Sequence, residues 1–218
     1  MKNKNDMLIV LAWPEGMVAN AGAWYDKFLA KNGKYRVGHS AIILASAKLK
    51  KVFYFDFGRY HTPIGYGRVR DADTDPDLSI KTPLKTTGSS ENIKEILFDI
   101  SKNRSTHGKG RLYASVLNNI NFKKAFKYAK KIQKKGAVPY GPFVFNGTNC
   151  SRFVASVIKA SDPPLHIKYR LTLPITISPS PKRNVSITNS NYYIVEKNIC
   201  KKITKSRIKS YFTSIERI

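Results

Sequence analysis

The sequence predicts one α+β domain over residues 1–218, with helices packed on a small, mostly antiparallel sheet. Three observations lead to this expectation. The 218 residues are 42% hydrophobic and 11% aromatic, a composition typical of chains that bury a core. Two β-rich runs flank a short polar joint, which is the pattern of a hairpin. Further segments place apolar residues at helical spacing between cap and stop residues.

The first part of the chain supplies most of the expected strands. The apolar run MLIVLAW (7–13) indicates a buried strand, and residues 17–33 are expected to form a helix that stops at an Asn-Gly pair. Residues 37–45 and 51–60 form the antiparallel hairpin. The many Gly, Pro, Asp and Thr residues between 62 and 90 indicate a long irregular loop of the kind that borders binding clefts.

The second part supplies most of the helices. We expect a helix in SSENIKEILFDISKN (89–103), a short strand or extended connector in RLYASVL (111–117), and a helix with one apolar stripe in NFKKAFKYAKKIQKKG (121–136). A further helix begins at Cys150, capped by Thr148 or Asn149, and ends at SDPP. Two or three β runs follow between 167 and 198. A basic segment, 196–218, closes the chain, and a helix is one option for it.

The formal charge is +25, and residues 100–161 contain no carboxylate. This distribution predicts a positive field and weak binding to polyanions such as nucleic acid or an anionic membrane surface. The alternative is that the lysines only keep the protein soluble. The charge alone does not choose between these interpretations.

Two cysteines are too few for a disulfide framework, and a metal site made of cysteines alone is not expected. A single bridge between Cys150 and Cys200 stays open. No run approaches the roughly 20 apolar residues of a membrane-spanning helix. We expect a cytoplasmic protein, although MVANAGA (17–23) imitates a signal cleavage site and leaves secretion open.

Cys150 is expected in the first turn of a helix, where the helix dipole and unpaired N–H groups stabilise a thiolate. By itself, such a cysteine is more often an inert core residue. A nucleophile needs a histidine within hydrogen-bond reach. His39 is the best placed of the four, because it opens a strand after Gly38. His166 competes with it, and His107 lies in a loop expected to be exposed to solvent.

Three local motifs resemble NlpC-type papain-fold peptidases. GHSAIIL (38–44) is similar to their Gly-His strand, NCSRFVASVI (149–158) to their Asp-Cys-Ser-Gly-Phe-Val helix start, and Tyr140-Gly141 to the site of an active-site tyrosine. The histidine precedes the cysteine, whereas the ordinary family has the reverse order. This order resembles the circularly permuted branch, which includes lecithin:retinol acyltransferase-like proteins and permuted papain-fold hydrolases. The likeness implies a catalytic core over about 37–160.

The resemblance implies that Cys150 is the nucleophile and His39 its acid–base partner, with Tyr140 and Asn149 on the oxyanion or substrate side and no cofactor or metal. The expected hairpin brings Asp56 opposite His39, where a carboxylate would orient the imidazole. A one-residue shift in register would turn Asp56 away. His61 or a backbone carbonyl could then take that role.

Two further alternatives concern individual residues. Asp56 could instead be a salt-bridge partner of Arg36 or Arg59. Arg152 stands where relatives have glycine, and Asn149 where they have an acid. The change at Arg152 bears on the substrate more than on the nucleophile.

The sequence therefore predicts a thiol-dependent hydrolase that cleaves an amide, peptide or ester bond, with a lipid ester among the possible substrates. A related acyltransferase is the first alternative. The second is a non-catalytic basic protein that binds nucleic acid or an anionic surface, and the third is a papain-like fold that has lost its activity.

Overall fold

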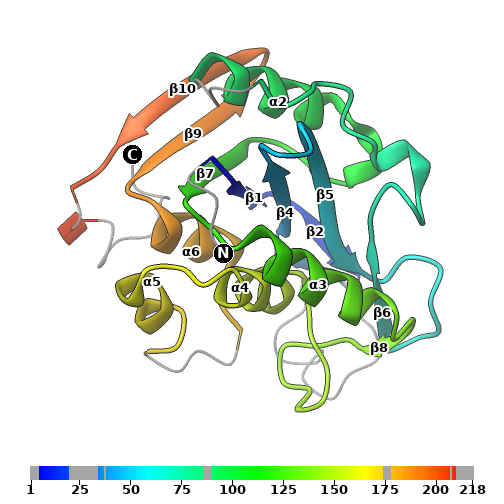
Figure 1. The fold of residues 1–218 in the computed structure, drawn as a ribbon. Coiled ribbons are helices and arrows are strands. Elements are labelled where there is room, and N and C mark those ends of the chain that lie inside the picture. Colours follow the sequence, from blue (N-terminus) through cyan, green and yellow to red (C-terminus); the bar gives the residue numbers. More distant parts are fainter. Residues whose placement is uncertain are drawn as a thin grey trace.

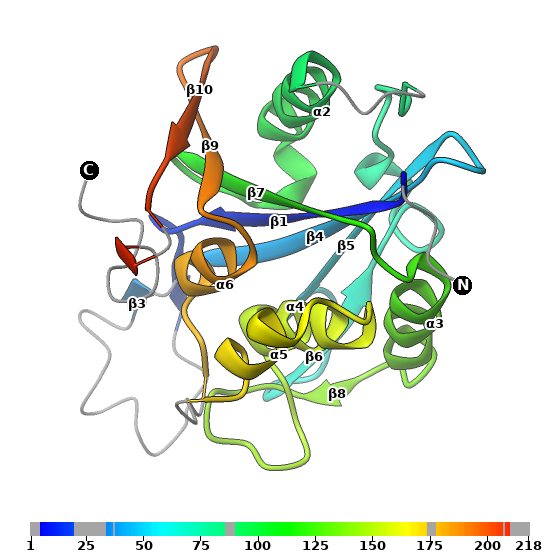
Figure 2. The same ribbon diagram turned by 60° about the vertical axis from the view of Figure 1, so that its left-hand side comes forward.

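The computed structural model describes residues 5–19, 34–36, 38–85, 90–173, 178–206 and 208–209. Its main feature is an eight-stranded sheet in the order β10-β9-β7-β1-β4-β5-β6-β8, and β2 and β3 form a separate pair. All strand pairs in the described residues are antiparallel. Helix α2 covers one face of the large sheet, and α3, α4, α5 and α6 lie on the other (Figures 1 and 2). The expected α+β class and mostly antiparallel sheet are confirmed.

The strands are β1 (Met7–Trp13), β2 (Met17–Ala19), β3 (Lys34–Arg36), β4 (His39–Ser46), β5 (Lys51–Gly58), β6 (Tyr66–Arg70), β7 (Leu112–Asn118), β8 (Val138–Pro139), β9 (Asn191–Glu196) and β10 (Ile199–Thr204). The α-helices are α2 (Ser90–Lys102), α3 (Phe122–Gln133), α4 (Cys150–Ala160), α5 (Leu165–Arg170) and α6 (Pro181–Thr188). Two short 3-10 helices, η1 (Pro76–Leu78) and η2 (Arg104–Thr106), complete the described elements.

The core lies on both faces of β1 and β4. Alternate side chains of a strand point to opposite faces. Leu8 and Ile42 therefore belong to the cluster that contains Phe153 of α4, whereas Ile9 and Ile43 belong to the cluster that contains Leu97 of α2. Because both faces are covered, these strands are continuous apolar runs without the polar alternation of a half-exposed sheet.

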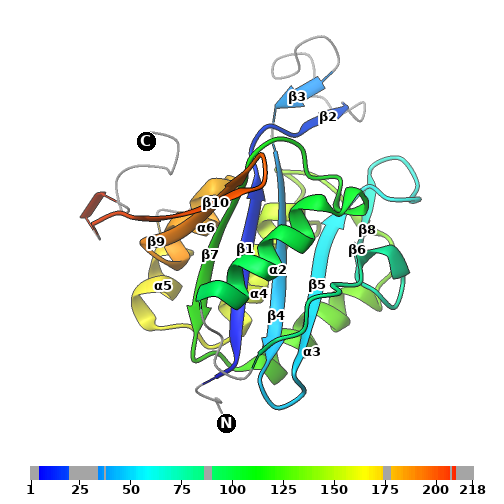
Figure 3. The same cartoon turned by 90° about the horizontal axis from the view of Figure 1, so that it is seen from above.

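The pair β2–β3 extends from the end of the large sheet where β1 ends and β4 begins (Figure 3). The backbone of Gly38 donates a hydrogen bond to the carbonyl of Gly16 at 3.0 Å, which closes the connection between the two strand ends. This end of the sheet holds Trp13, the last residue of β1, and His39, the first residue of β4.

Several expected elements differ from the structure. The helix expected over 17–33 is wrong at its start, because Met17–Ala19 forms a strand, and residues 20–33 lie outside the described part. The irregular loop expected over 62–90 contains β6, whose alternating YGRVR pairs with β5. Proline and glycine flanking this run hid its strand pattern.

The C-terminal part also differs. Two of the β runs expected between 167 and 198 are the helices α5 and α6, and among the described residues of that range only β9 is a strand. Helix α6 begins with a Ser180 cap, whose hydroxyl accepts the N–H of Arg183, and with Pro181 in the first turn. The basic segment forms β10, which pairs with β9 through Thr204, and residues 207 and 210–218 lie outside the described part.

Candidate active site

His39 is fixed by the glycine before it and by the ring of Trp13. Gly38 has φ +68, and a Cβ there would lie 2.7 Å from the carbonyl oxygen of Trp13 and 2.9 Å from Cα of Pro14. Only glycine fits this combination of conformation and close approach. The imidazole of His39 then stacks on the indole of Trp13 at 5.8 Å between ring centroids. The start of β4 therefore presents its histidine in one orientation.

The hairpin brings Asp56 to the imidazole. Asp56 pairs directly with Ala41, two residues beyond His39 and on the same face of β4. His39 Nε2 lies 3.2 Å from Asp56 Oδ2, and the two side chains are 12% and 0% exposed. The hairpin and its face parity agree with the sequence-based expectation. The carboxylate is in the position of an orienting group, and the other ring nitrogen, Nδ1, is left for Cys150.

Besides its contact with His39, Asp56 accepts four hydrogen bonds, from Arg70 on β6, Tyr54 on β5 and Tyr60 just after β5. Arg70 of β6 donates through Nε to Oδ1 at 3.0 Å and through Nη2 to Oδ2 at 2.6 Å. Tyr54 and Tyr60 donate their hydroxyls to Oδ2 at 3.0 and 3.4 Å. Burial alone would raise the pKa of Asp56, but the hydrogen bonds from His39 and Arg70 hold the pKa below its usual value. Asp56 is therefore a carboxylate at neutral pH.

The two tyrosines remain donors over a wide pH range. Burial, and next to it the negative charge of Asp56, raise the pKa of Tyr54 and Tyr60 well above the ordinary value. The guanidinium of Arg70 lies 3.4 Å from the centroid of the Tyr60 ring, so this ring covers the ion pair. The cluster keeps a buried charge paired and hydrogen-bonded, which buried charges require.

Cys150 is the first residue of α4, and Asn149 caps this helix with a side chain that accepts the N–H of Arg152 at 2.9 Å. Burial raises the pKa of the Cys150 thiol. The hydrogen bond to His39 and its charge lower it, as do the backbone N–H of Ser40 and the hydroxyl of Ser151, and the net direction is down. The structure thus places the expected cysteine and histidine close enough to shift each other's pKa.

The pKa of His39 shifts upward, opposite to the pKa of Cys150. Burial alone would lower the pKa of His39, but its hydrogen bonds to Asp56 and Cys150 raise the pKa to about 9. A cysteine with a lowered pKa next to a histidine with a raised pKa favours a thiolate–imidazolium pair at neutral pH. Neither cysteine is in a disulfide, so the bridge between Cys150 and Cys200 that the sequence left open is not formed.

Arg152 holds the loop that precedes Cys150 by hydrogen bonds to its backbone. Its Nη1 donates to the carbonyls of Gly141 and Val144 at 3.2 and 2.8 Å. Tyr140, which the sequence placed on the oxyanion or substrate side of Cys150, stacks on Phe57. The two nearly parallel rings lie 5.9 Å apart between centroids. A glycine in place of Arg152 could make neither hydrogen bond.

Asn149 and Arg59 have structural contacts of their own. Besides capping α4, Asn149 donates its amide to Ser178 Oγ at 2.7 Å, so both ends of its side chain are engaged. Arg59, one expected ion partner of Asp56, instead lies over the ring of Tyr140 at 5.5 Å. The side chain of Arg36, the other expected partner, lies outside the described part.

Of the other histidines, only His107 borders the Asp56 cluster. His61 and His166 are exposed, on the turn after β5 and on α5. His107 is exposed as expected, and its ring stacks on Tyr60 at 5.2 Å. Sequence reasoning missed Arg70 and the two tyrosines of the Asp56 cluster. The alternating run YGRVR was the available signal, because a third strand beside Asp56 places Arg70 opposite it.

The described residues contain no group of three or more His, Cys, Asp or Glu side chains suited to a metal ion. Their helices are all too short or too polar to cross a membrane.

The fold and the site define an α+β protein with a buried Asp-His-Cys cluster at the start of a core helix. Residues 8–166 match a family model described as type VI secretion system effector TseH-like, and the chain belongs to this family. The chain is also similar to a solved structure described as the crystal structure of the type VI secretion system effector TseH. That match has a TM-score of 0.65 and 18% identity, and covers 92% of this chain and 98% of the other. At this identity the likeness concerns the fold alone. No curated protein matches the chain.

Proposed function

We propose that the protein is a thiol-dependent hydrolase of the circularly permuted papain-like type, and that it acts as a secreted effector. The observation that carries the proposal is that Asp56 contacts His39, and that His39 and Cys150, the first residue of α4, shift each other's pKa. The family description supports the effector role. The histidine strand precedes the cysteine helix along the chain, which supports the permuted assignment. A single domain over 1–218 is part of the same proposal.

In the first half of the reaction, the Cys150 thiolate attacks the carbonyl carbon of an amide, peptide or ester. The N–H groups in the first turn of α4 have no carbonyl partner within the helix, so they can stabilise the oxyanion. The Tyr140 hydroxyl is the second candidate donor. The imidazolium of His39 then gives its proton to the leaving group, the carbon–leaving-group bond breaks, and an acyl-thioester forms on Cys150.

In the second half, the neutral imidazole of His39 takes a proton from water while the water oxygen attacks the thioester carbonyl. The carboxylic acid product leaves, and the thiolate and imidazolium are restored. Asp56 holds the imidazole in one tautomer and stabilises its positive charge in both halves. An acceptor other than water would give the related acyltransferase. Asn149 acts here by capping α4, since its side chain is already engaged.

Location follows from the effector role. An effector of a secretion system is made in the cytoplasm and acts after export. In this proposal, the cytoplasmic location expected from the sequence describes only the stage before secretion.

A burst experiment tests the chemistry. With p-nitrophenyl acetate as the probe, the protein is expected to release nitrophenol in a burst equal to the enzyme concentration, and mass spectrometry should find the acetyl group on Cys150. Cys150→Ala removes the burst, whereas Cys200→Ser, which changes the other free thiol, retains it. A burst that survives Cys150→Ala, or its absence in the unaltered protein, contradicts the proposal.

The rival function is a basic binding protein without catalysis, which the charge of +25 favours. An unreactive Cys150 together with strongly salt-dependent retention of DNA or RNA would support this rival.

A further inference from the structure

A loop next to the nucleophile carries large apolar side chains into solvent. The loop 141–147 joins β8 to α4, and Phe145 and Phe143 in it are 95% and 45% exposed. Ile64, on the turn between β5 and β6, is 89% exposed. A lone exposed apolar residue is ordinary on a soluble protein. Three such residues at adjoining loop tips are the pattern of a contact surface.

The two loops are joined at their bases, and together we call them the apolar rim (residues 62–66 and 141–147). Tyr66 pairs with Pro139, and the N–H of Tyr140 donates to the carbonyl of Gly65 at 2.8 Å. Arg152 holds the carbonyls of the second loop from inside. The backbone is therefore anchored at the base of the rim, while the apolar tips point outward.

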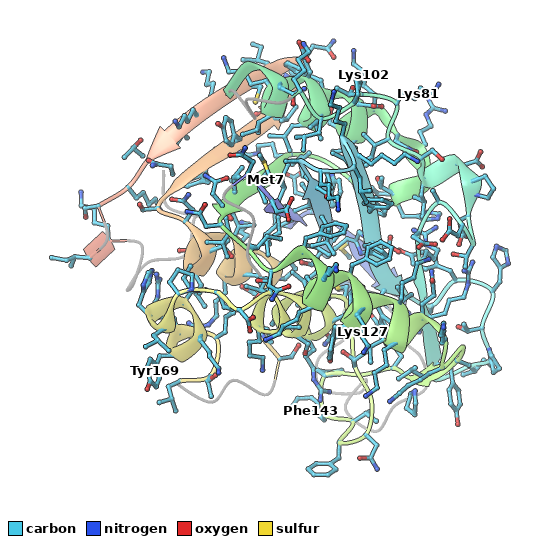
Figure 4. The ribbon with its side chains drawn as sticks, in the orientation of Figure 1. Met7, Lys81, Lys102, Lys127, Phe143 and Tyr169 are labelled. Atoms are coloured by element: carbon cyan, nitrogen blue, oxygen red, sulfur yellow. The ribbon has the colours of Figure 1, made fainter. Side chains whose placement is uncertain are left out.

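Lysines are frequent in the part of the chain that carries the second loop of the apolar rim. The region from 100 to 161 contains the second rim loop, α3 and α4, and it has no carboxylate. Helix α3 exposes the lysines Lys123, Lys124, Lys127 and Lys131. Figure 4 shows Phe143 and Lys127 on the lower side of the molecule, where Tyr169 of α5 also lies. Leu165 and Tyr169 are exposed on α5 with Lys168 between them. The loop between β8 and α4 lies on the side of the sheet that carries α3, α4 and α5 (Figure 2).

We propose that this face docks on an anionic lipid bilayer, with the apolar rim in the headgroup region and the lysines against lipid phosphates. Interfacial proteins combine these two features, since apolar side chains enter the acyl boundary and cations attract the anionic surface. A nucleic acid would contact the lysines but offers no apolar phase for Ile64. The proposal goes beyond the proposed function and does not depend on it, although it sets Cys150 next to the bilayer.

The test is co-sedimentation of the full chain with vesicles of phosphatidylcholine, with and without phosphatidylglycerol. The Cys150→Ala protein is used, so that hydrolysis cannot alter the lipids. We expect binding that requires phosphatidylglycerol and weakens with added salt. The double variant Phe143→Ser/Phe145→Ser should bind at least about tenfold more weakly, because it loses the apolar contacts. Ile199→Ser removes an exposed apolar side chain from β10, far along the sheet, and should bind like the parent.

Four results would overturn the proposal. These are no binding to the anionic vesicles, equal binding by the double variant, equal weakening by Ile199→Ser, and a dimer without lipid that the double variant dissociates. The last result would make the apolar rim an interface between copies of the chain. Circular dichroism checks that each variant is folded. The burst experiment on the unaltered protein is separate, so either proposal can fail while the other stands.

Discussion

Replacing Arg70 by methionine should strongly destabilise the protein, because it removes the guanidinium from the buried Asp56 carboxylate and leaves His39 as the remaining cation beside it. Arg70 makes two hydrogen bonds to Asp56, at 3.0 and 2.6 Å, and the side chains are 5% and 0% exposed. Removing one member of such a buried pair costs about 3–5 kcal/mol. Total stabilities of domains are roughly 5–15 kcal/mol. The loss should therefore be a large fraction of the free energy of unfolding.

The chain offers a matched control in Arg68, two residues away on the same strand. Arg68 makes the same bidentate pair with Asp75, at 2.8 and 2.7 Å, but both side chains are about one-fifth exposed. Such a solvated pair contributes about 0–1 kcal/mol. Urea unfolding at pH 7 measures both variants. If Arg70→Met costs no more than Arg68→Met, the reasoning about the buried cluster is refuted.

Arg70→Met should also change how the stability of the protein depends on pH. The pKa of Asp56 is lowered in the fold, so its contribution is present above the unfolded pKa of about 3.9 and is lost as the pH falls through the folded pKa. Arg70 is one cause of that lowering. In Arg70→Met the folded pKa rises, and acid unfolding should begin at a higher pH than in the unaltered protein.

Three further predictions concern single residues of the site. Asp56→Asn should move the alkaline limb of the burst rate to a pH below about 9, because the carboxylate helps to raise the pKa of His39; an unmoved limb would exclude Asp56 as the orienting group. Gly38→Ala should cost more free energy of unfolding than Gly136→Ala, since both have positive φ but only Gly38 is closely packed; equal costs in urea would contradict the packing argument. Arg152→Gly should speed proteolysis of the loop 141–147 without changing the pH dependence of alkylation at Cys150; unchanged proteolysis would show that the loop does not need the two hydrogen bonds.

Much of the site could be predicted because it depends on local patterns. The hairpin joint fixes the register of β4 and β5, and this register places Asp56 on the face of His39. The cap and apolar spacing place Cys150 at the start of a buried helix. Contact between these two parts, however, depends on how α4 packs on the sheet, and only the resemblance to a family indicated it.

The missed features depend on tertiary context. Arg70 lies in a short strand between Gly, Pro and Asp residues, and only pairing with β5 makes this segment a strand. Helix α6 has the β-branched residues Val185, Ile187 and Thr188, which favour strands in isolation. Its buried face and its Ser180 cap favour a helix over a strand. The segment after β9 had too few apolar residues to predict β10, which is held by pairing along one edge.

The most direct measurement is the rate of alkylation of Cys150 by iodoacetamide against pH, in a Cys200→Ser background. The proposed function predicts that the midpoint of the rate profile lies below about 8.5, the value for a free thiol, because His39 lowers the pKa of Cys150. His39→Ala should raise this midpoint towards the value for a free thiol or above, since burial would then be opposed only by the N–H of Ser40 and the hydroxyl of Ser151. A profile with a midpoint near the free-thiol value, unchanged by His39→Ala, would contradict the existence of the thiolate–imidazolium pair and with it the proposed function.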